Sequence, residues 1–379
     1  MDQSFSNRYC VAGIGHTRYG ASPDTSVENL HVQAIQQAVA DAGLTKYDID
    51  GVLCLAPVSN FQIGYAVKLS GLLGITPRIL GALDQEGASI ITLIGYAMMA
   101  IDAKQCSVAV ISYADNPRSG SRAIYGAPRG TDGIFGWFGT PAAYAMIARA
   151  HMEEYGTRAE QLGSVVVACR KHAQLTEHAE RHREFSMEQY LSQPMLVDPF
   201  RPADCALVSD GGAALIVTSL AHCQSLGIRD PIRILGIGQG HQPQGLSHRQ
   251  NLTTSGAVAS GRQAFAMAGL GTSDIDVAEL YDCFSITVPI TLEDYGFCDK
   301  GEGGPFVENG RIEIGGTLPV NTAGGLLAET GLPGPQLVIE AVRQMRGNCG
   351  ERQIMDAKVA LVSNQGGIMQ THSTLILGR

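Results

Sequence analysis

A tyrosine, a carboxylic acid and a thiol follow one another where an apolar segment of the chain ends. Residues 277–280 have the composition of a buried strand, and Tyr281, Asp282 and Cys283 come directly after it. α/β folds hold their chemistry where strands give way to loops or helices. Tyr281 is therefore our main candidate for a general acid or base. The alternative is that Tyr281 is a half-buried structural tyrosine with a satisfied hydroxyl.

Length and composition restrict the class of protein. The chain has 379 residues, which suits two domains or a duplicated one, and its 45% hydrophobic and 17% charged residues predict a large folded core. A net charge of -9 without a basic run argues against nucleic acid or an anionic membrane as a partner. The sequence contains no apolar stretch of about 18 residues that would span a bilayer.

Cysteine usage predicts the compartment. Nine cysteines are scattered singly, without a Cys-x-x-Cys pair. This pattern predicts reduced thiols and a cytoplasmic location, with neither a zinc site nor a disulfide framework. The polar start, Met1-Asp2-Gln3-Ser4, is not typical of a signal peptide.

Strands alternate with helices in the order expected of a mainly parallel sheet. The expected strands are residues 11–15, 51–56 and 107–112, and the expected helices are 26–42 and 88–103. Later segments repeat this order, because residues 234–238, 274–276 and 359–363 echo residues 11–15, 48–50 and 108–112. We therefore predict an internal duplication of one α/β unit, with halves at 1–225 and 232–379.

A long excursion, about residues 113–203, interrupts the first half. We predict a loop or cap domain here, with a helix near residues 141–155. Seven basic side chains follow this helix: Arg170, Lys171, His172, His178, Arg181, His182 and Arg183. They form either a solvated helix face or a cap over the site whose charges meet a phosphorylated ligand.

Four segments, taken together with the duplication and the inserted loop domain, resemble the thiolase superfamily over almost the whole chain. They are residues 204–214, 279–284, 321–325 and 340–347. These segments are similar to the branch around the sterol carrier protein X thiolases and their lipid-transfer-like bacterial relatives. The resemblance implies a thiolase fold, which is a duplicated five-layer α-β-α-β-α architecture with a loop domain inserted in the first half.

The side chains that make and break an acyl-cysteine intermediate in thiolases are missing. The position of the nucleophilic cysteine falls on Gly87, that of the Gly-His-Pro histidine on Leu332, and that of the second cysteine on Asn364. Tyr281 stands where thiolases have asparagine or histidine. We therefore predict that the chain performs no thiolysis through a covalent cysteine intermediate.

Other nucleophiles do not replace the missing cysteine. Ser89 has no adjacent base to activate it, and Cys205 and Cys283 lie in segments of structural character.

The electrostatic part of a thiolase site does not depend on these side chains. Backbone N–H groups at Gly87 and Gly366 can still form an oxyanion hole. Such a hole, with a nearby acid or base, is what retro-aldol cleavage of a β-hydroxyacyl-CoA requires. At Tyr281 the chain resembles the thiolase-superfamily steroid side-chain aldolases, which lack the cysteines and work with a small partner built from an OB-fold and a zinc ribbon. A second tyrosine of those aldolases falls here at about Gly331.

The first hypothesis is a carbon–carbon lyase of an acyl-CoA thioester, with Tyr281, Gly87 and Gly366 in catalytic positions. The second is a partner-dependent acyltransferase similar to acetyl-CoA acetyltransferase, and the third is a catalytically silent subunit that binds acyl-CoA or lipid. The candidate substrate-binding residues are Asp282, Asn321, Gly324, Gly325, Leu332 and Asn364. We expect no cofactor beyond the coenzyme A of the substrate. We also expect the chain to form a homodimer and to work with the small OB-fold and zinc-ribbon partner.

Overall fold

A computed structural model describes residues 5–126, 130–136, 139–242 and 245–379. Within these ranges nine strands form one hydrogen-bonded sheet in the order β3-β2-β4-β5-β1-β6-β9-β8-β7. The strands are β1 (Tyr9–His16), β2 (Gly51–Cys54), β3 (Ile79–Ala82), β4 (Val108–Asp115), β5 (Gly211–Ser219), β6 (Ile232–His241), β7 (Val277–Leu280), β8 (Val359–Gly366) and β9 (Thr371–Gly378).

The strand pairing repeats in the two parts of the sheet. In the first part β5 lies antiparallel to β1 and β4, and β2 lies parallel to β4 and β3. In the second part β9 lies antiparallel to β6 and β8, and β7 lies parallel to β8. A parallel bridge from Ala278 to Val320 stands where the first part has β3. Antiparallel pairing of β1 with β6 joins the two parts into one sheet.

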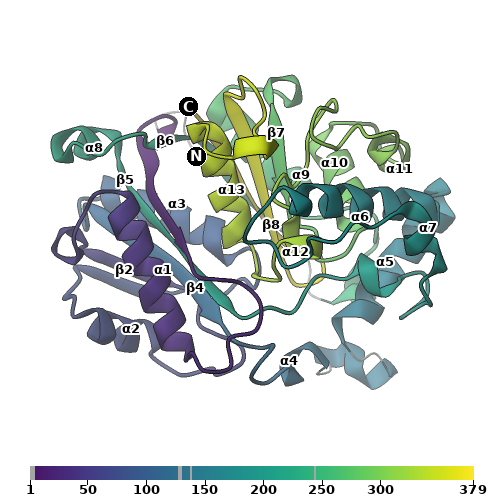
Figure 1. Ribbon diagram of the computed structural model, residues 1–379, viewed down its shortest axis with the longest axis horizontal. Helices are drawn as coiled ribbons and strands as arrows, with labels where there is room; N and C mark the ends of the chain where they lie inside the picture. The colour runs from purple at the N-terminus through teal and green to yellow at the C-terminus, as the bar shows by residue number, and fades with distance from the viewer. Residues whose placement is uncertain (1–4, 127–129, 137–138, 243–244) are drawn as a thin grey trace.

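Alternate residues of each strand face different cores, and this builds five layers. In β4, Val108 and Val110 pack with the helices α1 (Val27–Asp41) and α2 (Tyr65–Leu73). Ala109 and Ile111 face the opposite side, toward the central helices α3 (Ser89–Asp102) and α13 (Pro335–Arg346). Strand β8 has the same alternation, because Ala360 and Val362 share the central core with α3 and α13. Figure 1 shows α1 and α2 on one side of the molecule and α9 and α10 on the other, with α13 between them.

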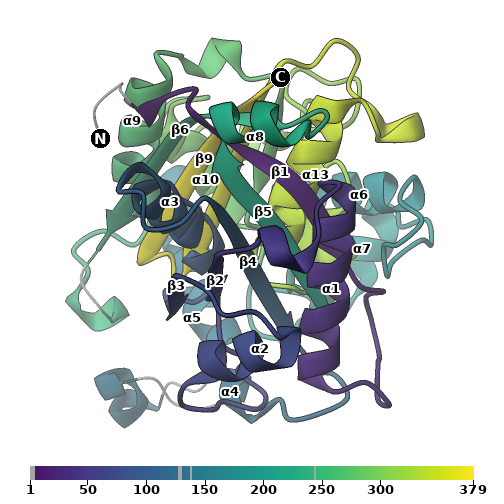
Figure 2. The same cartoon turned by 90° about the vertical axis from the view of Figure 1, so that its left-hand side faces the viewer.

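Glycines at the first strand of each part explain the sequence echo between residues 11–15 and 234–238. A side chain at Gly13 would collide with the Ala38 carbonyl of α1, and one at Gly236 would collide with the Ala264 carbonyl of α9 (Ala257–Ala268). The missing side chains therefore let an outer helix lie directly on its strand. Figure 2 shows α1 lying along β4 and β5.

The segment between β4 and β5 crosses to the second part of the molecule. It contains α4 (Ala123–Gly126), α5 (Thr140–Tyr155), α6 (Ala159–Gln174) and α7 (Met187–Ser192). The helix expected near residues 141–155 is α5. Buried side chains of α5 and α6, including Ile147 and Val166, share a core with Val288 and Ile290 of α10 (Thr287–Tyr295). Thus an insertion in the first half covers the outer face of the second, as the teal and green helices in Figure 1 show.

The remaining helices are short, and they are α8 (Leu220–Leu226), α11 (Gly303–Val307) and α12 (Gly325–Ala328). Among the residues described, none of the helices combines the length and the apolar composition needed to cross a bilayer.

Candidate active site

The Asn321 side chain fixes the end of β7 by hydrogen bonding to the backbone of the last residue of the strand. Asn321 accepts a hydrogen bond from the Leu280 N–H at 2.7 Å through its Oδ1 atom and donates one to the Leu280 carbonyl at 2.9 Å through its Nδ2 atom. Asn321 is buried and has a positive φ of 56°, a conformation that asparagine tolerates better than most residues. Because Leu280 is held on both backbone groups, the direction in which Tyr281 leaves the strand is also fixed.

The Tyr281 phenol lies against Gly87, two residues before helix α3 begins. A side chain at residue 87 would collide with the Tyr281 hydroxyl and with the backbone carbonyl of Gln365. The phenol therefore occupies the space that a cysteine at residue 87 would need. The absence of a side chain at Gly87 and the presence of tyrosine at 281 are two parts of one arrangement.

Gly366 lies beside the same loop. A side chain at Gly366 would collide with the Gln85 carbonyl, and the N–H of the next residue, Gly367, donates to the Glu86 carboxylate at 3.0 Å. The Tyr144 hydroxyl, from the inserted segment, donates to the Gly367 carbonyl at 3.0 Å. The three predicted catalytic positions, Tyr281, Gly87 and Gly366, therefore come together around one loop. The oxyanion-binding role of the two glycine N–H groups stays a prediction.

Burial raises the pKa of the Tyr281 phenol well above its ordinary value, and the neighbouring Cys283, Tyr125 and Glu86 add to this effect. The phenol is therefore neutral near pH 7 and has a proton to donate in a hydrogen bond. A neutral donor suits stabilisation of charge on a substrate oxygen, or delivery of a proton, better than removal of one.

The nearby nucleophiles are occupied or protonated. The Ser89 hydroxyl donates to the Glu86 carbonyl at 2.7 Å and accepts from the Gln85 N–H at 2.7 Å, so it is already bonded to the backbone that precedes α3. Burial raises the pKa of the Cys283 thiol to about 12 and that of Cys205 to about 12. These thiols are therefore not thiolates at neutral pH.

A buried scaffold lies behind Tyr281. The Asp282 carboxylate accepts hydrogen bonds from the N–H groups of Leu326 at 2.7 Å and Leu327 at 3.3 Å, both in α12. Burial raises the pKa of Asp282 to about 6, although these N–H donors oppose the effect. A side chain at Gly325 would collide with Asp282, and Gly325 has a positive φ of 61°.

Four predicted substrate-binding residues, Asp282, Asn321, Gly324 and Gly325, thus make contacts that hold the end of β7 and the start of α12. Gly324 has a positive φ of 113°, and a side chain there would meet Ala173 and the Glu329 N–H. Their contact with substrate stays a prediction.

Leu332 and Asn364 take the places of the thiolase histidine and second cysteine. Leu332 is buried and packs near Gly211 and Tyr19. Asn364 is buried beneath Gly334, and within the described residues neither its side-chain oxygen nor its nitrogen has a hydrogen-bond partner. A buried amide in this state favours a bound water or a polar ligand atom.

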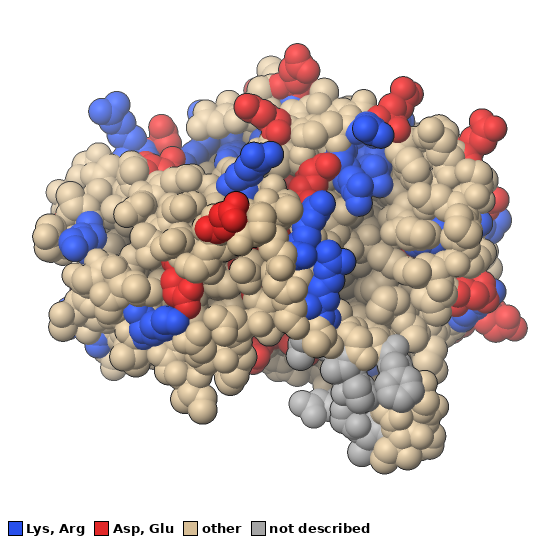
Figure 3. Space-filling model, turned by 60° about the horizontal axis from the view of Figure 1, so that its bottom comes forward, with Lys and Arg blue, Asp and Glu red and all other residues tan. Residues whose placement is uncertain are grey.

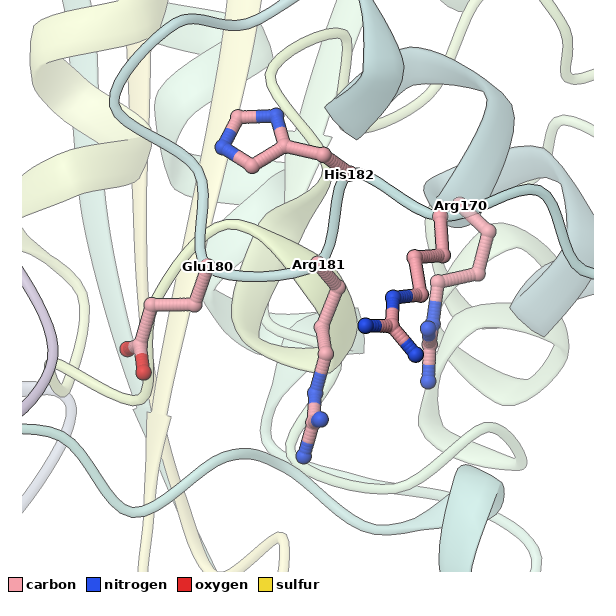
Figure 4. Close-up of a pocket in the computed structure, with 5 residues that line it drawn as sticks. Arg170, Glu180, Arg181 and His182 are labelled. Carbon is pink, nitrogen blue, oxygen red and sulfur yellow. The ribbon is translucent and has the colours of Figure 1, made fainter.

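The seven basic residues predicted as one cap or one solvated face separate into groups. His172 is a correction, because it is buried: its Nδ1–H donates to the Asn321 carbonyl at 3.0 Å, and its Nε2 accepts from the Ile314 N–H at 3.1 Å. Burial lowers its pKa, so it is a neutral structural residue rather than part of a basic surface. Lys171 pairs with Glu313 at 2.7 Å and His178 with Glu329 at 3.0 Å. The other four, Arg170, Arg181, His182 and Arg183, line a cavity of about 380 Å³ together with Glu180. On the face seen in Figure 3, Lys and Arg side chains gather beside a hollow. Figure 4 shows the guanidinium ends of Arg170 and Arg181 pointing toward a common region, with the Glu180 carboxylate turned to the other side.

Several residues near Tyr281 were not singled out from the sequence: Tyr144, Gln365, Glu86 and Tyr125. The Nε2 group of Gln365 donates to the Cys283 sulfur at 3.2 Å. Glu86 has a positive φ of 51° immediately before Gly87. The position of Glu86, an acid directly before the place of the missing nucleophile, was the feature of the sequence that could have pointed to these residues.

The five layers define a thiolase-like fold, in which Gly87 stands at the position of the nucleophilic cysteine and the Tyr281 phenol fills the space beside it. Residues 238–379 match the family described as thiolase C-terminal domain-like. The 17-hydroxy-3-oxo-4-pregnene-20-carboxyl-CoA lyase of Mycobacterium tuberculosis is 34% identical over 90% of this chain and 92% of its own length. An acetyl-CoA acetyltransferase of Methanothermobacter thermautotrophicus is 32% identical over 97% of this chain and 99% of its own.

The solved structure of the Ltp2-ChsH2(DUF35) aldolase superposes with a TM-score of 0.89 and 33% sequence identity, covering 99% of this chain and 98% of that one. The chain belongs to the thiolase superfamily. The predicted fold and the predicted branch, which holds the steroid side-chain aldolases, are both confirmed.

Proposed function

We propose that the chain is a carbon–carbon lyase that cleaves β-hydroxyacyl-CoA thioesters by a retro-aldol reaction. One observation carries the proposal: the Tyr281 phenol fills the space beside Gly87 that a thiolase nucleophile would need. An enzyme with this arrangement keeps a proton donor where acyl transfer requires a thiolate. The lyase and aldolase among its relatives support the predicted reaction class.

In the proposed reaction the thioester oxygen lies near the backbone of Gly87 and Gly366. The Cα–Cβ bond breaks, its electron pair enters the thioester enolate, and the β-carbon becomes a carbonyl. In one concerted relay Tyr281 gives its proton to Cα while its oxygen accepts the proton of the β-hydroxyl, so the phenol is restored. Hydrogen-bond donors aimed at the enolate oxygen are worth about 3–4 kcal/mol each in comparable enzymes. No cofactor beyond the coenzyme A of the substrate takes part.

The protonation state of Tyr281 makes this role testable. Because its pKa is raised above 10, the proton-donating form is fully populated at neutral pH and is lost only when the pH exceeds that pKa. The rate of the step that depends on Tyr281 should therefore be constant from pH 6 to pH 9. A tenfold rise in turnover per pH unit over this range would instead mean that a minor phenolate acts as the base.

The first experiment incubates the purified protein with β-hydroxyacyl-CoA substrates, beginning with steroid side-chain thioesters because the Mycobacterium tuberculosis relative is a pregnene carboxyl-CoA lyase. The expected products are a ketone or aldehyde and a shortened acyl-CoA. Conversion of no β-hydroxyacyl-CoA, with or without a DUF35-type partner, would overturn the proposal.

Acyl transfer is the second candidate, because an acetyl-CoA acetyltransferase is a full-length relative. This function would need an acyl acceptor on the protein or on a partner. After incubation with acetyl-CoA, intact mass spectrometry should show no acyl adduct on Cys283 or Ser89. A stable adduct would favour the transferase, whereas binding of acyl-CoA without any turnover would favour a silent subunit.

We also infer a homodimer. Within the described residues β3 is the last strand at one edge of the sheet, and an unpaired strand edge pairs readily with another chain. Exposed apolar side chains lie on β3 and on helix α2, which packs against β3: Leu80 is on the strand and Val67 on the helix. Phe61 and Ile63, the latter 97% exposed, precede α2 in the sequence. Substitution Leu80→Lys should produce monomers in light scattering.

A small DUF35-type protein is the partner that we propose to test for co-purification, because ChsH2(DUF35) accompanies the related aldolase. We place the protein in the cytoplasm, and all nine cysteines are free thiols in the structure, as reducing conditions would maintain them.

A further inference from the structure

Two buried cysteine sulfurs lie in contact at the start of β1. The Cys10 sulfur is 3.2 Å from that of Cys223, a residue of α8, and the two side chains share a hydrogen bond. Both are fully buried, in the core that includes α1. Within the described residues no hydrogen bond joins any other two cysteine sulfurs. Since a disulfide bond is about 2.05 Å long, the two sulfurs need to approach by only roughly 1 Å to be joined.

The path of the chain places the two cysteines together. Cys10 lies opposite Thr218 in the antiparallel pairing of β1 with β5. Ser219 ends β5, and its side chain accepts a hydrogen bond from the His222 N–H at 3.1 Å, so α8 begins directly after the strand. The turn from β5 into α8 therefore brings Cys223 against Cys10.

A short peripheral helix covers the pair. Cys223 is the one buried residue of α8, a helix of seven residues that lies wholly within the described part of the chain. Helices this short are marginally stable by themselves, and α8 lies at the edge of the molecule in Figure 1. Local opening of α8 therefore exposes both sulfurs without unfolding the sheet.

The pair differs from another buried thiol of the same core in how it ionises. The hydrogen bond from Cys10 holds the pKa of the Cys223 thiol below its ordinary value, whereas burial raises the pKa of Cys54 to about 12. The thiolate is the form of cysteine that reacts with oxidants. Cys223 is therefore the sulfur that reacts first, and Cys10 is the sulfur in position to attack the oxidised product.

We propose that Cys10 and Cys223 form a reversible disulfide bond when the protein meets a peroxide. The Cys223 thiolate attacks one oxygen of hydrogen peroxide, the O–O bond breaks, and a sulfenic acid forms while the released hydroxide takes up the former thiol proton as water. The Cys10 sulfur then attacks the Cys223 sulfur, the S–O bond breaks, and a second water leaves with the Cys10 proton. Two thiols are oxidised, and the peroxide is reduced by two electrons.

The bond closes residues 10–223, almost the whole first half, into one covalent loop. Cross-links that close long loops restrict the unfolded chain most, so the oxidised protein should be the more stable form. The pair lies at the start of β1, which runs parallel to β2, β3 and β4. Gly87, which contacts Tyr281, follows the opposite end of β3. Oxidation of the pair should therefore leave turnover at the candidate active site unchanged.

The test treats the reduced protein with hydrogen peroxide, blocks the remaining thiols with an alkylating reagent, and maps the peptides by mass spectrometry without reduction. We expect a peptide that joins Cys10 to Cys223 and that is lost after addition of dithiothreitol. The Tm of the oxidised protein should exceed that of the reduced protein by roughly 5 °C. Cys223→Ala should abolish both changes, whereas the control Cys54→Ala, which removes a thiol from the same core, should keep them.

A second variant tests the route of the oxidant. Gln224→Gly weakens α8 at an exposed position, so cross-linking should become about two- to threefold faster. Equal rates in this variant and in the wild type would overturn the assignment of access to α8.

Absence of the peptide that joins Cys10 to Cys223 from folded, peroxide-treated wild-type protein would overturn the proposal. Oxidation that stops at sulfinic acid, or that links these cysteines to others, would overturn it as well, because the two sulfurs would then not react with each other. Each variant is compared with its own reduced form, so a loss of stability caused by the substitution alone does not affect the result.

Discussion

At the start of β2 the Asp50 carboxylate accepts hydrogen bonds from the N–H groups of Ser107 and Val108, each at 2.8 Å. At the start of β7, Asp276 does the same for Lys358 at 2.7 Å and Val359 at 2.9 Å. The other ends of these strands differ. Leu55 follows β2 and is buried in the central core, whereas Tyr281 follows β7 and meets Gly87. The halves therefore share residues where the fold requires them and diverge where the candidate chemistry lies.

A second difference lies inside the strands. The parallel registers pair Gly51 with Ala109 and Val277 with Ala360, so Glu279 of β7 stands where β2 has Leu53. Glu279 is buried, and burial raises its pKa well above the ordinary value. At this position an ionisable side chain is therefore buried in the second half, whereas the first half has an apolar one.

The largest expected effect comes from removing the feature that separates the two strand ends. Tyr281→Phe deletes the hydroxyl alone, so folding should change little, while turnover of the β-hydroxyacyl-CoA should fall about 10²–10⁴-fold. The matched control is Leu55→Met at the equivalent point of the first half, where a volume-conserving change should leave turnover intact. Steady-state kinetics measure both. An unchanged rate in Tyr281→Phe, with substrate bound, would make Tyr281 a structural tyrosine.

The next effect tests whether Gly87 and Tyr281 form one arrangement. In Gly87→Ala the new methyl group would collide with the Tyr281 hydroxyl, so we expect a loss of about 1–3 kcal/mol in the free energy of unfolding and a large loss of turnover. Adding Tyr281→Ala should restore part of the stability and none of the activity, which a double-mutant cycle detects. Gly71→Ala is the control, because nothing lies within 4 Å of the added group. Additive effects of the two substitutions would disprove the coupling.

A smaller effect concerns the buried acids of the second half. Burial and the charge of Glu340 raise the pKa of Glu329 to about 8, from an ordinary value near 4.5. Between these values the unfolded chain has lost the proton that the folded chain keeps, so stability falls as the pH rises through this window. Glu329→Gln should reduce that slope by up to about 1.4 kcal/mol per pH unit. Urea unfolding at pH 5, 6.5 and 8 measures it, with the exposed Glu184→Gln as control. If the free energy of unfolding of Glu329→Gln depends on pH as steeply as that of the wild type, the pH dependence does not come from Glu329.

The substitutions with the smallest expected effect on turnover should change stability equally in the two halves. Asp50→Asn and Asp276→Asn each weaken a pair of charge-assisted hydrogen bonds to a strand start, so each should lower the free energy of unfolding by about 1–3 kcal/mol. Neither change should alter the pH dependence of turnover, because both lie at the strand ends away from Tyr281. Chemical denaturation compares them. A clear inequality would mean that the shared motif serves one half only.

The sequence was most informative where one residue type has one physical use. The repeated Asp-Ile-Asp and Gly-x-Gly segments predicted the duplicated topology, because strand starts need acceptors and close helix contacts need glycine. Tyr281 was identifiable because it follows an apolar strand. Its contact with Gly87 was not readable from the sequence alone, since it depends on two segments that only the folded sheet brings together. The resemblance to thiolases placed both residues in the candidate active site, and the folded structure shows that they are in contact.

Other features were missed for physical reasons. Strands β3, β5 and β9 were not recognised, because their short or apolar runs lack an alternation that separates a strand from a buried helix. His172 was grouped with surface charges, although it follows Leu162, Val165 and Cys169 on the buried face of α6 at helical spacing. That periodicity would have placed it in the core. The cavity around Arg170 and Arg181 depends on a loop conformation that spacing does not determine.

The insertion that crosses from the first half to the second has a consequence during synthesis. Helices α5 and α6 leave the ribosome more than a hundred residues before α10, whose side chains complete their core. Until then the nascent chain carries an apolar surface that nothing covers, and such surfaces attract chaperones and other nascent chains. The inserted segment therefore cannot complete its core within the first half, and a ribosome stalled before residue 287 would hold an aggregation-prone intermediate.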